Sequence, residues 1–322
     1  MNPEQAYQYL VEKIDVTNQM VTYAKAFMLE HFQENTDHLL TSLLQNVEAT
    51  KPSQIVIHQS VDTPGLLTKA AKYISWDLAS REALWGLITS NLLIQGSSDL
   101  ADRNGTLDWT TVIPGSGGQS TGWQFNEYSL PVPRKVILRP SGISSYERTL
   151  SDPDLFLHEI NIEGLNIEIE KSLRESVLCY KNELFLGCLA LLGKAAEGAW
   201  IELGLAMASA IPTGAPINGV RLKESVEDPF IGIGKKISLV LNAYERRDVF
   251  QEIYRESGYK PTDLKSCVVW GDAVRESRNS IHYGAEPSMA NSYEKVSALL
   301  IGTVPNLKVI YSIVIACNES QA

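Results

Sequence analysis

Apolar residues recur at helical spacing over most of the chain, and this spacing predicts a mainly helical protein. Over residues 3–48 the pattern predicts two or three amphipathic helices. A short β-type run follows at residues 51–60, and Pro64 suits the start of the next helix. Ser80 then suits the N-cap of a further helix, whose apolar stripe ends at Leu92.

The hydrophobic period changes after residue 106, where aromatic and β-branched residues become frequent. Three strands are predicted, at residues 107–113, 122–130 and 134–140. The order of two helices followed by a β-ribbon resembles a winged-helix module. Its second helix would offer a DNA groove only a few polar side chains, Arg81, Thr89, Ser90 and Asn91. We therefore expect residues 1–150 to form a helical and winged-helix-like domain that is structural or binds a partner rather than reading an operator.

The densest basic stretch of the chain lies in the last predicted strand of this region. Arg134, Lys135 and Arg139 stand there without an acidic residue among them. Two interpretations stay open, a solvated strand surface and a small patch that contacts nucleic acid. The whole chain has 28 Lys and Arg against 38 Asp and Glu, a net charge of -10, so any contact with nucleic acid must be local.

Residues 151–322 form a second predicted domain that is almost wholly helical. Helices are expected at 166–182, 184–211, 230–258, 261–284 and 292–317, the last bent near Pro305. The Pro and Gly content of residues 212–229 predicts a loop instead. The helix expected at 184–211 is apolar nearly all round, which indicates a central helix with several neighbours.

Other features of the composition narrow the class of protein. No apolar run approaches the roughly 18 residues that a membrane span needs, and the first residues are too polar for a signal peptide, so no membrane and a cytoplasmic location are expected. The four cysteines lie far apart in apolar patterns and are expected to be reduced core residues. The histidines outside residues 275–284 lack metal-ligand spacing: His31, His38, His58 and His158.

Two arginines, an asparagine and a histidine fall within the ten residues RESRNSIHYG, 275–284. If the helix runs to Gly284, Arg275 and His282 point from nearly the same face, about 10 Å apart along the axis. Arg278 and His282 would then be neighbours at i and i+4. In the last turn the helix dipole favours imidazolium and Arg278 disfavours it, which suits acid or base work near neutral pH.

This run resembles the R-x4-6-H motif of the HEPN superfamily of compact helical bundles, and the helix pair around Glu197 is similar to the first half of such a domain. The resemblance covers about residues 152–318. It implies a homodimer that cleaves RNA without metal or cofactor, with the 2′-hydroxyl as nucleophile. His282 would be the acid or base, Arg275 would stabilise charge on the phosphate, and Asn279 would orient the site. Arg278 falls outside the motif spacing and would be an auxiliary phosphate contact.

The sequence therefore leaves three functions open. The first is a HEPN-like, metal-independent endoribonuclease with a toxin or antiviral defence role, which the family resemblance alone implies. The second is a non-catalytic HEPN-like protein that dimerises or binds a partner. The third is a winged-helix DNA-binding regulator, which the acidic composition disfavours.

Overall fold

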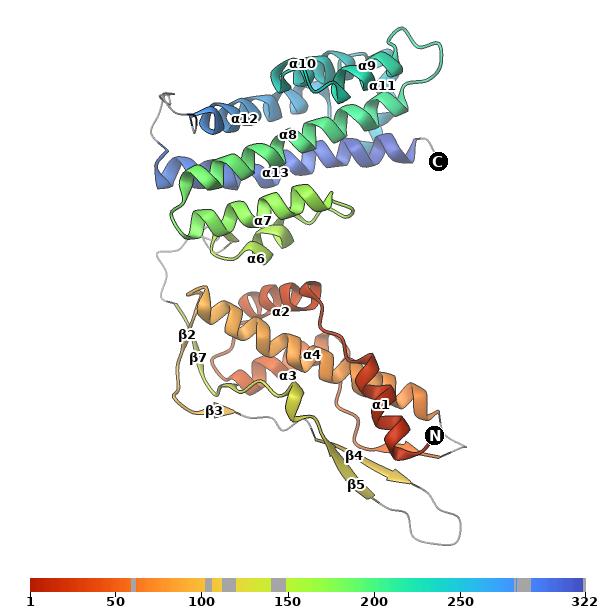
Figure 1. Cartoon of the computed structure of the whole chain (residues 1–322), viewed down its shortest axis with the longest axis vertical. Helices are drawn as coiled ribbons and strands as arrows, with labels where there is room; N and C mark the ends of the chain where they lie inside the picture. The colour runs from red at the N-terminus through yellow and green to blue at the C-terminus, as the bar shows by residue number, and fades with distance from the viewer. Residues whose placement is uncertain are drawn as a thin grey trace. The chain divides into compact units, whose positions relative to one another are not determined.

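The computed structural model describes residues 1–58, 62–101, 106–111, 120–139, 149–280, 282 and 291–320. The chain divides into two compact units, Met1–Gly142 and Ile143–Ala322, whereas a boundary after residue 150 was expected (Figure 1). Most of the described residues are helical, so the predicted mainly helical class is confirmed.

The first unit is built on one long central helix. Helix α4 contacts three shorter helices and the strands β1, β2 and β6. Each helix begins at a residue whose side chain accepts a hydrogen bond from a backbone N–H of the first turn, as N-capping requires. The four helices and their caps are α1, Pro3–Lys13 after Asn2; α2, Asn18–Glu30 after Thr17; α3, Thr36–Asn46 after Asn35; and α4, Thr63–Thr89 after Asp62.

The predicted helix start at Ser80 is wrong, because α4 runs without interruption from Thr63 to Thr89. Ser80 is fully buried and its hydroxyl donates to the carbonyl of Asp77, 2.7 Å away. A serine can bond inside a helix in this way as well as at an N-cap, and neither Gly nor Pro interrupts the chain at this point. The helix ends where Asn91 takes a left-handed φ of 56° and Leu92 N–H bonds back to Leu87 C=O.

The strands of the first unit form three small ladders rather than one ribbon. The predicted strand at 134–140 does not join the other two predicted strands, and part of the 122–130 run forms a 3-10 turn. In the first ladder β1 is parallel to β4 and β4 is antiparallel to β5; the other two ladders pair β2 with β7 and β3 with β6. The bounds are β1 Ile55–Ile57, β2 Leu93–Gln95, β3 Leu100–Ala101, β4 Thr106–Thr111, β5 Ser120–Gln124, the 3-10 turn Asn126–Tyr128, β6 Val132–Pro133 and β7 Val136–Leu138.

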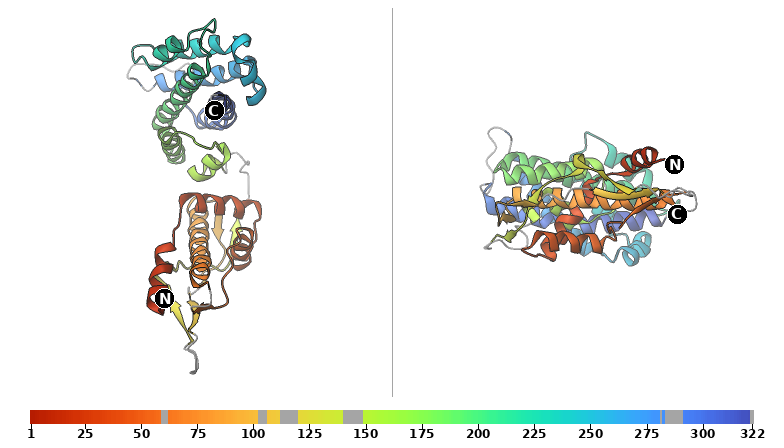
Figure 2. Two further views of the ribbon diagram at one scale, coloured as in Figure 1. Left: turned by 90° about the vertical axis from the view of Figure 1, so that its right-hand side faces the viewer. Right: turned by 90° about the horizontal axis from the view of Figure 1, so that it is seen from below.

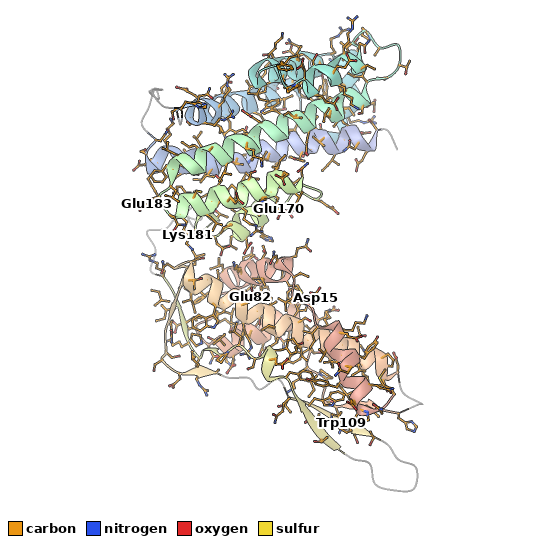
Figure 3. All side chains as sticks on the ribbon, viewed as in Figure 1. Asp15, Glu82, Trp109, Glu170, Lys181 and Glu183 are labelled. Carbon is orange, nitrogen blue, oxygen red and sulfur yellow. The ribbon has the colours of Figure 1, made fainter. Side chains whose placement is uncertain are left out.

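Aromatic side chains fix the β4–β5 ladder to the helices. Trp109, labelled in Figure 3, stacks on Trp123 of the neighbouring strand with ring centroids 5.6 Å apart. Tyr7 of α1 stacks in turn on Phe125, at 5.4 Å. These rings and the apolar residues of β1 make a core that is separate from the helical core of the second unit.

The second unit is a bundle of helices around α8. Helix α8 contacts α7, α9, α10, α12 and α13, and Figure 2 shows α13 nearly end-on beside it. The helices are α6 Pro153–Ile160, α7 Ile167–Lys181, α8 Phe185–Ala210, α9 Gly219–Glu227, α10 Ile233–Tyr244, α11 Arg247–Ser257, α12 Pro261–Asn279 and α13 Tyr293–Glu319. The expected central position of the 184–211 helix is thereby confirmed.

Glycines along α8 explain how so many helices approach it. A Cβ added at Gly204 would lie 2.8 Å from Val226 of α9 and 2.9 Å from Val240 of α10, closer than side chains pack. A Cβ at Gly193 would lie 2.9 Å from the Arg278 side chain on α12. Small residues on α8 therefore set the distance to the helices that carry the predicted site.

The predicted loop at 212–229 is only partly correct, because it contains helix α9. Asn218 caps this helix by accepting from Arg221 N–H, and Leu222 and Val226 bury one face. These two apolar residues are four positions apart, which is typical of a helix. The prediction gave more weight to the Pro and Gly content of the segment. Asparagine followed by one helical turn is enough to begin a short helix here.

By length and composition alone, helix α13 is long and apolar enough to cross a membrane, whereas no apolar run of that kind was expected. The helix is continuous with Pro305 inside it, and the bend expected near this residue stays a prediction. Leu300, Leu307, Ile310 and Ile313 are fully buried in the core of the second unit. This burial is typical of the core helix of a folded domain.

Candidate functional site

Helix α12 holds the predicted cluster because its opposite face is anchored in the core. Pro261 occupies its first turn, and Lys260 N–H donates to the Asp263 carboxylate at 2.7 Å. Leu264 and Val274 are buried, and the indole N–H of Trp270 donates to Leu299 C=O at 3.1 Å. These contacts fix the part of the helix that carries Arg275, Arg278 and Asn279.

The predicted continuation of this helix to Gly284 is wrong, because α12 ends at Asn279 and Gly284 lies outside the described residues. The Ser280 hydroxyl donates to Ser277 C=O at 2.6 Å, so it takes up one of the carbonyls left at the helix end. Asn291 donates to the same hydroxyl at 2.9 Å. His282 follows the helix and does not pair with Arg278 in a last turn.

His282 and Asn279 both lie at the surface. The His282 side chain is exposed, and its backbone N–H donates to Asn279 C=O at 3.3 Å. Asn279 is the last residue of α12 and is also exposed. No hydrogen bond or ion pair joins the side chains of Arg275, Asn279 and His282 among the residues that the structure describes. The three groups are accessible to a large ligand but are not preassembled within this chain.

Arg275 lies beside the beginning of α10. Its Nη2 is 2.9 Å from Asp272 Oδ1, and both side chains are about half exposed. A Cβ added at Gly234 would lie 2.3 Å from Arg275 Nη1, so the guanidinium sits directly against the first turn of α10. Sequence reasoning missed this neighbour, because the two segments are some forty residues apart. The only local signal was two glycines and two lysines in the run GIGKK, 232–236.

Arg278 faces a different neighbour, Glu197 of α8. Arg278 Nη1 donates to Glu197 Oε1, and the side chains are 35% and 27% exposed. The stem of Arg278 crosses Gly193, which leaves it space. The two arginines of the cluster therefore have separate partners, and the guanidinium of Arg278 is already engaged within the fold.

A small hollow lies between α8, α10 and α12, with Arg275 at its edge. We call it the α10 hollow; its lining residues are Gly193, Ala196, Glu197, Trp200, Ile233, Ile237, Gly271, Val274 and Arg275. Trp200 is 1% exposed, and its indole N–H has no hydrogen-bond partner among the described residues. The hollow brings together a buried donor, an arginine and the beginning of a helix.

The basic stretch of the first unit, Arg134, Lys135 and Arg139, is exposed but partly engaged. Lys135 Nζ lies 2.8 Å from Glu34 Oε2. Arg134 and Arg139 are exposed, and their backbones are fixed: Arg134 N–H donates to Asp99 C=O and Arg139 N–H to Leu92 C=O. The three side chains are therefore accessible to solvent. The acidic neighbour of Lys135, Glu34, was not indicated by the sequence.

Arg81, the one cation expected on a DNA-reading helix, is buried instead. It is 1% exposed, its Nε lies 2.8 Å from Asp77 Oδ2, and its Nη1 donates to Leu130 C=O at 2.8 Å. Trp85, one turn later, donates to Pro131 C=O at 2.8 Å. Arg81 and Trp85 thus tie the segment before β6 to α4, and the Arg81 guanidinium is engaged inside the fold.

Three of the four cysteines lie in the core as predicted, whereas Cys179 is only partly buried. All four are free thiols, and three of them, Cys188, Cys267 and Cys317, are buried. Burial raises the pKa of the Cys188 thiol to about 11 and that of Cys267 to about 12. Across the described ranges, no group of three or more His, Cys, Asp or Glu side chains is arranged to hold a metal ion.

Comparison with known proteins returned no match: no protein-family model, no curated protein and no solved structure is similar to this chain.

Proposed function

We propose that the second unit is a metal-independent endoribonuclease in which Arg275, Asn279 and His282 act on the RNA backbone. One observation carries this proposal: Arg275 and His282 are accessible at one end of α12, whereas Arg278 is engaged with Glu197. A general acid or base must reach its substrate, and an exposed imidazole meets that requirement. The resemblance of this segment to the R-x4-6-H motif adds to the proposal.

The proposed reaction is an internal transfer at phosphorus. The RNA 2′-oxygen attacks the adjacent phosphorus, the bond from phosphorus to the 5′-oxygen breaks, and the products carry a 2′,3′-cyclic phosphate and a 5′-hydroxyl. One proton leaves the 2′-hydroxyl and one reaches the departing 5′-oxygen. His282 serves one of these transfers, as base or as acid, while Arg275 stabilises charge on the phosphate and Asn279 orients the group.

The proposed enzyme is a homodimer, because the three side chains are not assembled within one chain and a second copy can supply the remaining proton transfer. A defence or toxin role and a protein partner for the first unit belong to the same proposal. Arg134, Lys135 and Arg139 are its candidate contacts to the RNA outside the reactive group, with Arg278 as an auxiliary group only if its pair with Glu197 opens.

Cleavage of a labelled single-stranded RNA by the purified full chain, in the presence of a chelator, tests the proposal. We expect His282→Ala to lower the cleavage rate by about 10²–10⁴-fold, the usual contribution of a general acid or base. His158→Ala is the matched control, because His158 is also exposed and lies in the last turn of a helix of the same unit, α6. Equal rates for the two variants, or no cleavage by the unmodified chain, would refute the proposal.

A second candidate function is a non-catalytic dimerisation or interaction protein. The observation that favours it is that both arginines of the cluster already have carboxylate partners, Asp272 and Glu197. In that case the Arg278–Glu197 pair holds α12 to α8, and the chain dimerises without cutting RNA. Sedimentation of the full chain, measured beside the cleavage assay, separates the two functions: a stable dimer with no cleavage supports the second.

A further inference from the structure

The first turn of α10 has backbone donors that nothing in the described structure satisfies. Its N-cap residue, Gly232, has no side chain to accept a hydrogen bond. The N–H groups of Ile233 and Gly234 likewise have no partner among the described residues. Helix N-termini with free N–H groups attract anions, because the donors and the helix dipole point at the same place.

Positive charge gathers at this same helix end, contrary to the usual preference for acidic residues. The first turn contains no acidic residue but includes Lys235 and Lys236, and the Arg275 guanidinium lies against Gly234. Cations at the positive end of a helix are unfavourable unless an anion joins them. Asp272 offsets only part of this charge, since its pair with Arg275 is exposed to solvent.

Trp200 supplies a separate reason to expect a ligand. Its indole N–H is buried and unpaired, which costs free energy unless an acceptor is present. Gly271 leaves space beside this group, because a Cβ there would lie 3.2 Å from Trp200 Nε1. The α10 hollow is small: its volume of about 10 Å³ holds about one atom of the size of a water molecule. This space suits a single oxygen of a tetrahedral anion and is too small for a nucleobase.

We propose that the α10 hollow is the phosphate subsite for the RNA backbone. One non-bridging phosphate oxygen enters the hollow and accepts from Trp200 Nε1, and a second faces Arg275 and the free N–H groups of Ile233 and Gly234. The Glu197 carboxylate also lines the hollow, but its charge is balanced by Arg278. This inference rests on the proposed function for the identity of the ligand, and it assigns Trp200 and the beginning of α10 to substrate binding.

Binding is tested apart from cleavage with an oligonucleotide that lacks all 2′-hydroxyls, because the proposed reaction cannot cut it. The full chain is labelled with ¹⁵N, and the indole N–H resonance of Trp200, identified from its loss in Trp200→Phe, is followed during titration. We expect a saturable shift of this resonance with the oligonucleotide, and a weaker one with inorganic phosphate. A shift with inorganic phosphate alone would overturn the assignment to the RNA backbone, and no shift with either would remove the subsite.

Two glycines two residues apart give a matched pair of variants. Gly234→Ala places a methyl group where Arg275 Nη1 lies, whereas Gly232→Ala points into open space. We expect Gly234→Ala to weaken oligonucleotide binding at least tenfold and Gly232→Ala to change it less than twofold; equal affinities would overturn the proposal. If Gly234→Ala does not fold, Arg275→Gln replaces it with the same expectation.

The outcome also separates this inference from the proposed nuclease. If the Trp200 resonance shifts on binding but no RNA is cut, the phosphate subsite is supported and the nuclease is refuted. If Gly234→Ala leaves the cleavage rate unchanged and the Trp200 resonance does not shift, the nuclease is supported and the subsite is refuted.

Discussion

Replacing Arg278 and Arg275 in turn should separate stability from function within one helix. Arg278→Ala removes a partly buried partner of Glu197, whereas Arg275→Ala removes an exposed partner of Asp272. The first change leaves a half-buried carboxylate without its cation and removes the stem that covers Gly193. The second leaves Asp272 in water, where it needs no partner.

The size of each effect follows from exposure. An exposed ion pair contributes about 0.2–1 kcal/mol, and breaking a fully buried one costs about 3–5 kcal/mol. The Arg278–Glu197 side chains are 35% and 27% exposed, so its loss should cost roughly 1–2 kcal/mol. For a unit of about 180 residues, this loss lowers the melting temperature by roughly 3–6 °C, against about 3 °C or less for Arg275→Ala.

Scanning calorimetry of the full chain measures both shifts. A double-mutant cycle with Glu197→Gln then isolates the pair, and the two single changes should not add, because either one breaks the same interaction. An equal melting temperature for the two arginine variants, or full additivity with Glu197→Gln, would refute the assignment of Arg278 to the fold.

Three further predictions concern buried groups in both units. Arg81→Ala should lower the stability of the first unit by about 3–5 kcal/mol, measured by urea unfolding, because it leaves the mostly buried Asp77 without its cation; a loss below about 1 kcal/mol would contradict the buried pair. Burial and the hydrogen bond to Glu202 raise the pKa of the Tyr311 phenol, so above pH of about 10 the unfolded chain loses this proton while the folded chain keeps it. The free energy of unfolding should therefore fall as pH rises from 9 to 11, by up to about 1.4 kcal/mol per pH unit for this group, and the fall should be shallower in Tyr311→Phe. Because burial raises the pKa of Cys188 to about 11, iodoacetamide at pH of about 8.5 should modify it at least tenfold more slowly in the folded chain than in urea, and equal rates would contradict its burial.

Helical spacing predicted much of the fold because most helices bury one face. The regions 3–48, 166–182 and 184–211 all form helices at or near the expected positions. Two of the errors fall where a serine hydroxyl has two uses. Ser80 and Ser280 both satisfy a nearby carbonyl, yet the first continues a helix and the second ends one. The surrounding packing decides between these outcomes, and a single sequence does not specify it.

The candidate site was predictable only in part, for the same reason. The spacing of Arg275 and His282 follows from the sequence, whereas the partners of Arg275 and Arg278 depend on how α8 and α10 pack against α12. Trp200 gave no signal, because a buried tryptophan in an apolar helix is ordinarily a core residue. Its unpaired N–H became meaningful only beside Gly271 and the free end of α10.

The most direct test of the account is the cleavage of one RNA sequence with and without its 2′-hydroxyls. With the full chain and a chelator, we expect cutting of the RNA, fragments that end in a 2′,3′-cyclic phosphate, and no cutting of the 2′-deoxy strand. Cleavage of both strands, cleavage that the chelator abolishes, or an intact RNA would each contradict the claim that this chain is a metal-independent endoribonuclease.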